Sequence, residues 1–170
     1  MAKVNARRLT AQVDGDFVVF LIGMRVNKFW KVHKWWPAFM AMPRMLKELA
    51  SDPKSGLLGF ELKFSLRAPT VIQYWRSFER LETYAKSKDA QHYPAWVKFN
   101  KAVGSNGDVG IWHETYLVRA SEYECVYNNM PAYGLGKATS LVTATEKRAS
   151  AAQRLGREPH GEPPSGSYIT

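Results

Sequence analysis

The run Val109–Met130, VGIWHETYLVRASEYECVYNNM, decides how the chain is interpreted, because its first ten residues read as a β-strand. Alternate side chains of a strand point to opposite faces, so the neighbours His113 and Glu114 diverge. Both faces also carry bulky apolar side chains, which is typical of a strand covered on both sides. We therefore expect this strand to be central in its sheet, with one of the two ionisable groups lining an enclosed small-molecule pocket.

The segments before this strand alternate between strand and helix patterns. The sequence predicts a first strand over Asp16–Asn27, a helix within Lys28–Ser51, and a hairpin of two strands over Leu57–Leu66 and Thr70–Arg76. It then predicts a helix over Phe78–Lys88, after the N-cap Ser77, and a further helix over Asp89–Val103. Gly23 inside the first strand indicates a bulge or the close approach of another group. Pro37 and Pro43 predict that the first helix begins at Pro37 and bends near Pro43.

This order, βαββαβ, is the ferredoxin-like pattern: an α+β fold with one antiparallel sheet and helices on one of its faces. The other face is also apolar, so a second copy is expected to cover it, which gives a dimeric α+β barrel. The chain is predicted to divide into an N-terminal arm (residues 1–15), the ferredoxin-like domain (16–136), a C-terminal helix (137–155) and a flexible tail (156–170).

Composition narrows the function classes. The net charge is +9, but the sequence has no run of five or six like charges and no helix-turn-helix, zinc-finger or RNP pattern, so no nucleic-acid partner is expected. The single Cys125 excludes an intrachain disulfide, and no metal-ligand spacing is present. No apolar run is long enough for a membrane span, so the expected location is cytoplasmic. Dinucleotide, Walker and serine-hydrolase motifs are absent from the sequence.

Six segments carry a resemblance to a known family: GMRVNKFWKVHKWWP, SGLLG, QYWRSFERLETYA, HYPAW, GIWHETY and YNNMPAYGLG. They resemble a monooxygenase-like family of unknown function, of the antibiotic-biosynthesis-monooxygenase type, over about residues 15 to 137. The resemblance implies membership of the dimeric α+β barrel superfamily and a homodimer. That superfamily includes cofactor-free oxygenases of aromatic polyketides, haem-degrading oxygenases, haem-dependent dehydratases, chlorite dismutases and plain binding proteins.

The resemblance also implies cofactor-binding candidates. Haem-degrading members use an Asn late in the first strand, an aromatic residue in the helix after the hairpin and a His further along as the iron ligand. Asn27, Tyr84 and His92 stand at roughly these places. The sequence departs from the pattern in having Tyr in place of Trp and in the interval between Tyr84 and His92.

The residues themselves suggest a catalytic region at His113, Glu114 and Tyr116. Histidine is the natural general base near neutral pH, and a desolvated Glu can act in the same range. The alternative is a hydrogen-bonded core His and a Glu paired with an Arg. Further candidates for binding substrate are cationic, aromatic or amide side chains that could equally be structural: Arg25, Trp75, Arg76, Trp96, Trp112, Tyr127 and Asn129.

Three functional hypotheses remain open. The first is a monooxygenase-like enzyme acting without a cofactor on a small apolar or aromatic molecule, in which a base deprotonates an activated carbon and O₂ adds. The second is a haem protein with His92 or His113 as the axial ligand. The third is a non-catalytic dimer that binds an apolar ligand.

Overall fold

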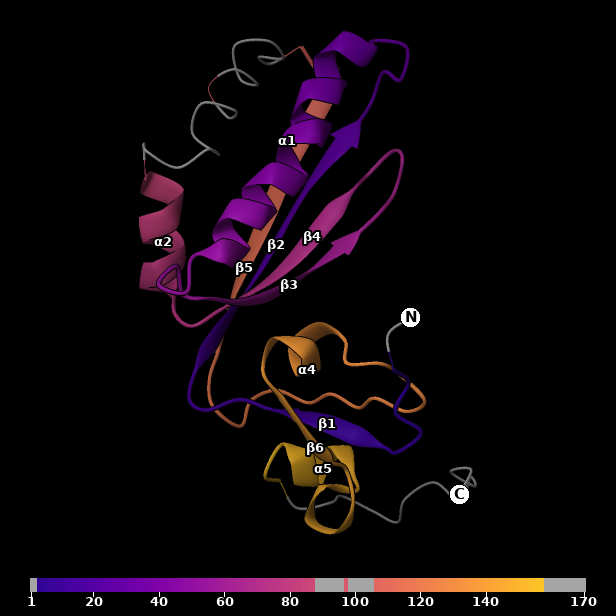
Figure 1. Ribbon diagram of the computed structural model, residues 1–170, viewed down its shortest axis with the longest axis vertical. Coiled ribbons are helices and arrows are strands. Elements are labelled where there is room, and N and C mark those ends of the chain that lie inside the picture. Colours follow the sequence, from indigo (N-terminus) through magenta and orange to yellow (C-terminus); the bar gives the residue numbers. More distant parts are fainter. Residues whose placement is uncertain (1–2, 88–96, 98–105, 158–170) are drawn as a thin grey trace.

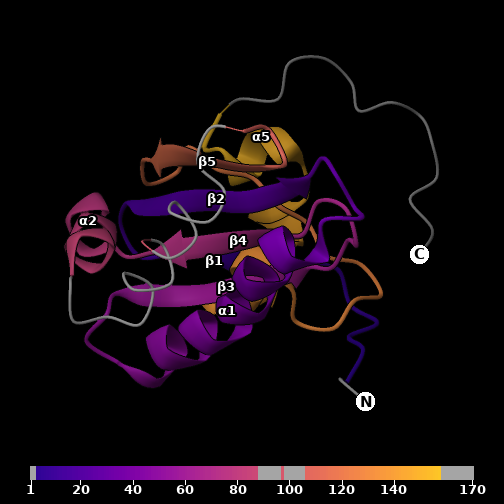
Figure 2. The same cartoon turned by 90° about the horizontal axis from the view of Figure 1, so that it is seen from above.

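The main sheet confirms the predicted α+β fold. A computed structural model describes residues 3–87, 97 and 106–157. Within them, four antiparallel strands have the spatial order β3-β4-β2-β5, which Figure 2 shows from above. Their bounds are β2 Phe17–Val26, β3 Leu57–Lys63, β4 Thr70–Trp75 and β5 Val109–Val118. With α1 (Val32–Ser51) after β2 and α2 (Phe78–Lys86) after β4, the chain follows the ferredoxin-like order (Figure 1).

Helices α1 and α2 cover one face of this sheet, and the core lies between them and the strands. The Ser77 hydroxyl accepts a hydrogen bond from the Arg80 backbone N–H, which caps α2 as the sequence predicted. Trp75 is fully buried against Leu49 and Leu81. Burying an aliphatic or aromatic side chain of this size contributes about 1.5–3 kcal/mol, so this contact fixes α1 and α2 on the sheet.

Helix α1 begins five residues earlier than predicted, at Val32, and contains both prolines. The cause is tertiary packing around Trp35. Its ring is buried with Met24 and Val26 of β2, and its indole N–H donates to the Phe29 carbonyl oxygen at 3.0 Å. This burial offsets the backbone hydrogen bond that a proline removes from the interior of a helix.

Strand β5 lies at the edge of the sheet, so the prediction of a central strand was wrong. Among the described residues it pairs with β2 alone, from Phe17 opposite Val118 to Val26 opposite Val109. Its apolar side chains are correspondingly exposed, with 70% of Leu117 accessible. The pattern of apolar side chains along a strand shows which residues share a face of the sheet. It does not show whether the strand is hydrogen-bonded to one neighbouring strand or to two.

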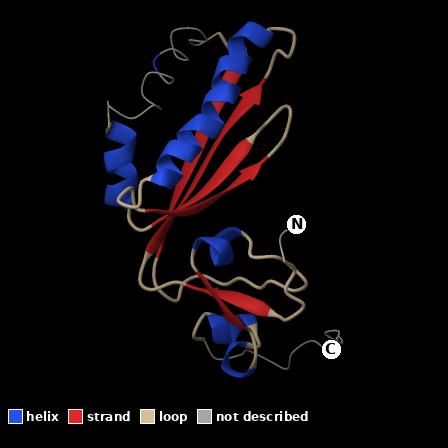
Figure 3. Ribbon diagram, in the orientation of Figure 1, coloured by secondary structure: helices blue, strands red, loops and turns tan. Residues whose placement is uncertain are grey.

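The chain ends form a second, two-stranded sheet in place of the predicted long helix over 137–155. β1 (Leu9–Gln12), within the expected arm, pairs with β6 (Ser140–Thr143), and Figure 3 shows this pair below the main sheet. Short helices flank β6: α4 (Gly134–Ala138), η1 (Glu146–Arg148) and α5 (Ala151–Arg154). The helical pattern of 137–155 is overridden by pairing with a strand more than 120 residues away, which a local pattern cannot report.

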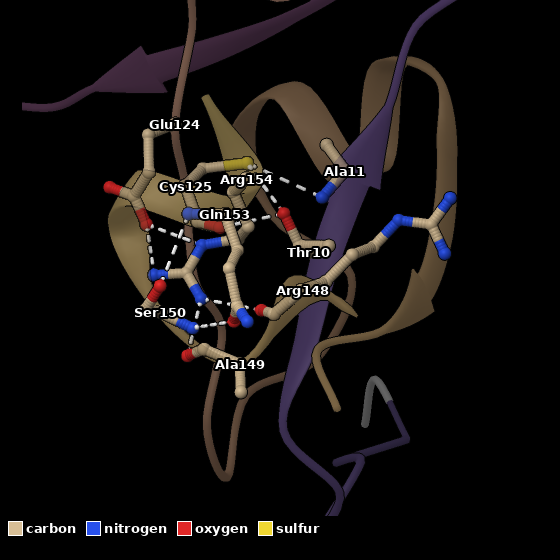
Figure 4. Close-up of polar contacts among 9 residues, drawn as sticks. All are labelled: Thr10, Ala11, Glu124, Cys125, Arg148, Ala149, Ser150, Gln153 and Arg154. Atoms are coloured by element: carbon tan, nitrogen blue, oxygen red, sulfur yellow. Dashed lines mark hydrogen bonds and ion pairs between the residues drawn. The ribbon is translucent and has the colours of Figure 1, made fainter. Parts of the chain in front are cut away.

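The last of these helices is held by Arg154, whose side chain is 6% exposed (Figure 4). Its Nε donates to Glu124 at 2.7 Å, and one Nη donates to the carbonyl oxygens of Arg148 and Ala149. A planar guanidinium supplies these several donors at once. Arg154 therefore ties α5 to the segment that follows β5.

Helix α4 lies on the face of the main sheet opposite to α1 and α2, so that face is partly covered within one chain. A Cβ placed on Gly59 would stand 2.8 Å from the Ala138 Cβ. Leu135 packs with Phe17 and, at the edge of the cluster, Tyr74. In the described part of the chain, no helix is long and apolar enough to cross a membrane.

Candidate functional site

A cavity of about 700 Å³ lies between the main sheet and helices α1 and α2. Its floor is formed by the helix-facing side chains of three strands: Phe20 and Ile22 of β2, Gln73 of β4, and His113 and Thr115 of β5. The walls are largely apolar and come from both helices: Met42, Met45, Leu46, Leu49, Phe78, Leu81, Glu82, Tyr84, Ala85 and Lys86. A concave, mainly apolar space with a few polar groups is the usual form of a small-molecule site.

His113 belongs to this cavity. It lies directly opposite Ile22 in the β2–β5 ladder, and its ring centroid is 5.7 Å from that of Phe20. The imidazole lines the cavity, and His113 is also an exposed residue. It can therefore exchange a proton with a bound molecule.

Glu114 and Tyr116 lie on the other face of the sheet. The Tyr116 hydroxyl donates to the Glu114 carboxylate at 2.6 Å, and this hydrogen bond raises the pKa of Tyr116. The two side chains thus form a surface pair, separated from His113 by the thickness of the sheet. The structure brings His113 together with Tyr84 and Gln73, and it places Glu114 and Tyr116 elsewhere.

Tyr84 lines the cavity from α2, with its ring centroid 5.7 Å from that of Trp75. Burial, and secondarily the charge of Glu48, raises the pKa of Tyr84 to about 12. Its phenol is therefore neutral over the physiological range. Trp75 itself is completely buried, and its indole N–H donates to Gln73 Oε1 at 2.9 Å, so it supports the cavity floor from within the core.

The other proposed substrate-binding residues lie away from this cavity. Arg25 is exposed on the opposite face of the sheet, and Arg76 donates to the Asp14 carbonyl oxygen at 3.0 Å. The Trp112 ring packs against Gly23 on that opposite face. The Tyr127 hydroxyl accepts from the Gly136 N–H at 3.0 Å, and burial raises its pKa. Asn129 has a φ of 52°, in the left-handed region that Asn tolerates in turns.

Asn27, one of the three residues that the resemblance assigned to a cofactor, has a different local role. Its Nδ2 donates to the Gly107 carbonyl oxygen at 3.1 Å, which ties the end of β2 to the loop before β5. In the same loop Asp108, with a side chain only 1% exposed, pairs with Lys28 and Lys31 at 2.9 and 2.8 Å. Asn27 therefore belongs to a structural junction. His92 and Trp96 lie outside the described residues.

Gln73 and the methionines of α1 were missed as cavity residues. Gln73 carried a usable signal: it stands between Val71 and Trp75 on the apolar face of a strand, where an amide needs a polar partner. Met42 and Met45 carried none, since apolar residues at helical spacing look the same whether they fill a core or line a cavity. Among the described residues, no group of three His, Cys, Asp or Glu side chains is placed to hold a metal ion.

The sheet order and its helix-covered face define a protein of the ferredoxin-like α+β class. The sequence matches the family described as monooxygenase af470-like over residues 17–135, so the chain belongs to that family. No curated protein matches the sequence.

Solved structures show likeness of fold. The chain is similar to a crystal structure of aldoxime dehydratase, with a TM-score of 0.58 and 18% identity over 88% of this chain and 43% of that one. It is also similar to SnoaB, a cofactor-independent oxygenase from Streptomyces nogalater, with a TM-score of 0.43 and 13% identity over 61% of this chain and 94% of that one.

Proposed function

We propose that this protein is a monooxygenase-like enzyme that acts on a small apolar or aromatic molecule in the cavity between the sheet and helices α1 and α2. The observation that carries the proposal is the position of His113, an accessible imidazole on the floor of a largely apolar space of about 700 Å³. Histidine suits general base catalysis near neutral pH. Membership of a monooxygenase-like family supports this class of reaction.

In the proposed reaction, His113 takes a proton from a substrate CH₂ group that an adjacent aromatic or carbonyl system makes acidic. The resulting carbanion transfers an electron to O₂, and the two radicals combine into a peroxide anion. The anion takes up a proton, and loss of water leaves a C=O group. One O₂ is consumed and one water is released, and the substrate supplies all the electrons. The apolar walls would hold the substrate and exclude water from the carbanion.

The test uses anthrone, whose CH₂ group lies between two aromatic rings, with an oxygen electrode and the absorbance of the anthraquinone product. We expect turnover above the uncatalysed background in the intact protein, and a loss of about 100-fold or more in His113→Ala, the range typical of a lost general base. The exposed His33 of α1 lies outside the cavity, so His33→Ala is the matched control and should retain activity.

Two results would decide against this mechanism. Turnover unchanged in His113→Ala would remove His113 from the reaction. Binding of anthrone without any oxygen consumption would favour the non-catalytic binding protein, because the cavity would then hold a ligand that it does not convert.

Haem binding is the second candidate, and the same residue favours it, since an accessible imidazole in an apolar cavity can serve as an axial ligand. Tyr84 lies in this cavity and Asn27 does not, so the described residues fit the haem-degrading pattern only in part. Titration with hemin tests this candidate: a sharp Soret band near one-to-one stoichiometry, lost in His113→Ala or His92→Ala, would support it. An unchanged hemin spectrum would remove it.

We also propose that the protein is a homodimer formed through the sheet face opposite to α1 and α2. The ladder places Glu61, Ile72, Leu21 and Glu114 in one row across all four strands of that face. The row therefore has an apolar middle flanked by two carboxylates, of which Glu61 is held by α4 through the Gly134 N–H and Lys137. A second copy would bury the apolar middle.

A further inference from the structure

Gln73 is a buried polar side chain on the floor of the cavity, and the proposed reaction gives it no role. It is 6% exposed and lies opposite Phe20 in the β2–β4 ladder. Its neighbours on the same face of β4, Val71 and Trp75, are apolar core residues. An amide in such surroundings is costly unless its donors and acceptor are satisfied.

The orientation of this amide is fixed by Trp75. The indole N–H is a donor only, so the group that it meets at 2.9 Å must be the carbonyl oxygen, Oε1, of Gln73. Because Trp75 is completely buried, this hydrogen bond is on the core side of the amide. Among the described residues, this is the one side-chain hydrogen bond of Gln73, and Nε2 donates none. The amide therefore keeps two donor hydrogens available at the cavity floor.

The other polar groups around the cavity are satisfied or peripheral. Lys86 and Glu82 form an ion pair with each other at 2.8 Å, with side chains 73% and 46% exposed. Tyr84 and Thr115 lie at positions open to solvent to a greater degree than Gln73. Gln73 is thus the deeply buried donor among the described lining residues, and a ligand that fills the cavity would meet it.

We propose that the Gln73 amide donates a hydrogen bond to an oxygen atom of the bound molecule. This inference rests on the proposed function, because it concerns the same cavity, and it narrows the ligand class to an apolar cyclic molecule that carries a carbonyl or phenolate oxygen. Trp75 is then a positioning residue, which holds the amide with its N–H groups toward the ligand. A purely hydrocarbon ligand would leave these donors buried and unpaired.

The location of Gln73 relative to His113 fits this assignment. Gln73 and His113 are on the two strands that flank β2. Gln73 lies opposite Phe20 and His113 lies opposite Ile22, two residues further along β2, so their Cα atoms are roughly 12 Å apart at standard sheet spacings. Their side chains extend from the same face into one cavity. A ring system held by its oxygen at Gln73 can therefore present another edge to His113. When His113 removes a proton from a ketone, negative charge develops on that oxygen, and a fixed donor stabilises it.

The experiment compares two probes of nearly equal shape, 1-tetralone and tetralin, which differ in one carbonyl oxygen. Dissociation constants are measured by ligand-detected NMR for the wild type and for Gln73→Met, in which an apolar chain of similar length replaces the amide. We expect the preference for tetralone over tetralin to fall about three- to tenfold in Gln73→Met, the usual size of one neutral hydrogen bond. Met45→Leu changes an apolar wall residue and should leave the preference unchanged.

Gln73→Met also leaves the Trp75 N–H without an acceptor, which can destabilise the fold. A second pair of variants avoids this problem: Trp75→Phe, which keeps the amide, and Trp75→Phe with Gln73→Met, which removes both partners of the hydrogen bond. The double variant should show a weaker preference for tetralone than Trp75→Phe alone. An equal preference within this pair, in proteins shown to be folded by circular dichroism, would overturn the inference.

Failure of this inference can be distinguished from failure of the proposed function. If the preference falls as expected but anthrone is not oxidised, Gln73 binds the ligand oxygen and the proposed reaction is wrong. If anthrone is oxidised and the preference does not change, the reaction stands and the role of Gln73 is refuted. If neither probe binds the wild type and anthrone is not oxidised, the cavity is not a site for such ligands, and both proposals fail.

Discussion

The ring of Trp112 on β5 lies against Gly23 on β2, so closely that a Cβ at position 23 would stand 2.7 Å from the Trp112 Nε1. Gly23 and Trp112 are directly opposite each other in the ladder. The sequence indicated a bulge or a close approach at Gly23, and the structure shows the close approach. A glycine here lets the large ring of an edge strand lie flat on the sheet.

Gly23→Ala should therefore destabilise the protein by about 1–3 kcal/mol, the usual cost of overpacking a close contact. Gly110 is the matched control: it is also a strand glycine on this face of the sheet, and a Cβ there would meet nothing within 4 Å. Urea denaturation of the two variants measures the difference. Equal stability of Gly23→Ala and Gly110→Ala would show that Trp112 can move aside freely.

Asp108→Asn should lower the melting temperature at neutral pH, because it removes the charge that the buried carboxylate shares with Lys28 and Lys31. Hydrogen bonds from Lys31, then from Lys28, lower the pKa of Asp108. A lowered folded-state pKa gives stability that is present above the ordinary value of 3.8 and is lost as the pH falls through the folded-state value.

Thermal unfolding from pH 7 to pH 2 checks this prediction. The difference in melting temperature between the wild type and Asp108→Asn should be largest near neutrality and shrink at the acid end. Asp14→Asn replaces an exposed carboxylate and should track the wild type. A constant difference at all pH values would mean that Asp108 acts through its shape and not through its charge.

Tyr84→Phe should make the protein less sensitive to alkali. Burial raises the pKa of Tyr84 from 10.0 to about 12, so its phenol stays neutral in the folded protein while it ionises in the unfolded chain. The stability from this raised pKa is complete below pH 10 and is lost as the pH rises through 12. Melting temperatures between pH 9 and 12 should therefore decline more steeply in the wild type than in Tyr84→Phe. Parallel declines would contradict this prediction.

Ile72→Lys should convert the proposed dimer into a monomer, because it places a charge in the middle of the apolar row between Leu21 and Glu61. Light scattering coupled to size exclusion measures the mass directly. Ile111→Lys introduces the same charge on the helix-facing side of β5, where Ile111 is already 47% exposed, and should leave the dimer intact. A wild-type monomer, or dissociation by Ile111→Lys alone, would exclude this face as the interface.

The ferredoxin-like core could be predicted from the sequence because local patterns determine it. The alternation in Leu57–Lys63, the β-branched residues of Thr70–Trp75 and the N-cap Ser77 each act within a few residues. The divergence of His113 and Glu114 was predictable for the same reason, because it follows from the pleat of a strand.

What could not be predicted depends on partners that are distant in the sequence. The edge position of β5 depends on which strands are neighbours, and β6 forms because β1 supplies its hydrogen bonds. The role of Gln73 depends on the Trp75 indole and on helices α1 and α2, which enclose the space above it. The alternation along β5 placed His113 and Glu114 on opposite faces of the sheet, but it did not indicate which of these faces borders the cavity.

The pairing of β1 with β6 has a consequence for where this protein can be divided. The family match covers residues 17–135, and both strands lie outside it. A fragment cut at those limits would lose Ala11, which packs against Phe17 and Leu135, the residues at the two cut ends. Removing β1 alone would likewise leave β6 without its hydrogen-bonding partner. The segment that matches the family, residues 17–135, is therefore shorter than the stretch of chain whose contacts build this fold.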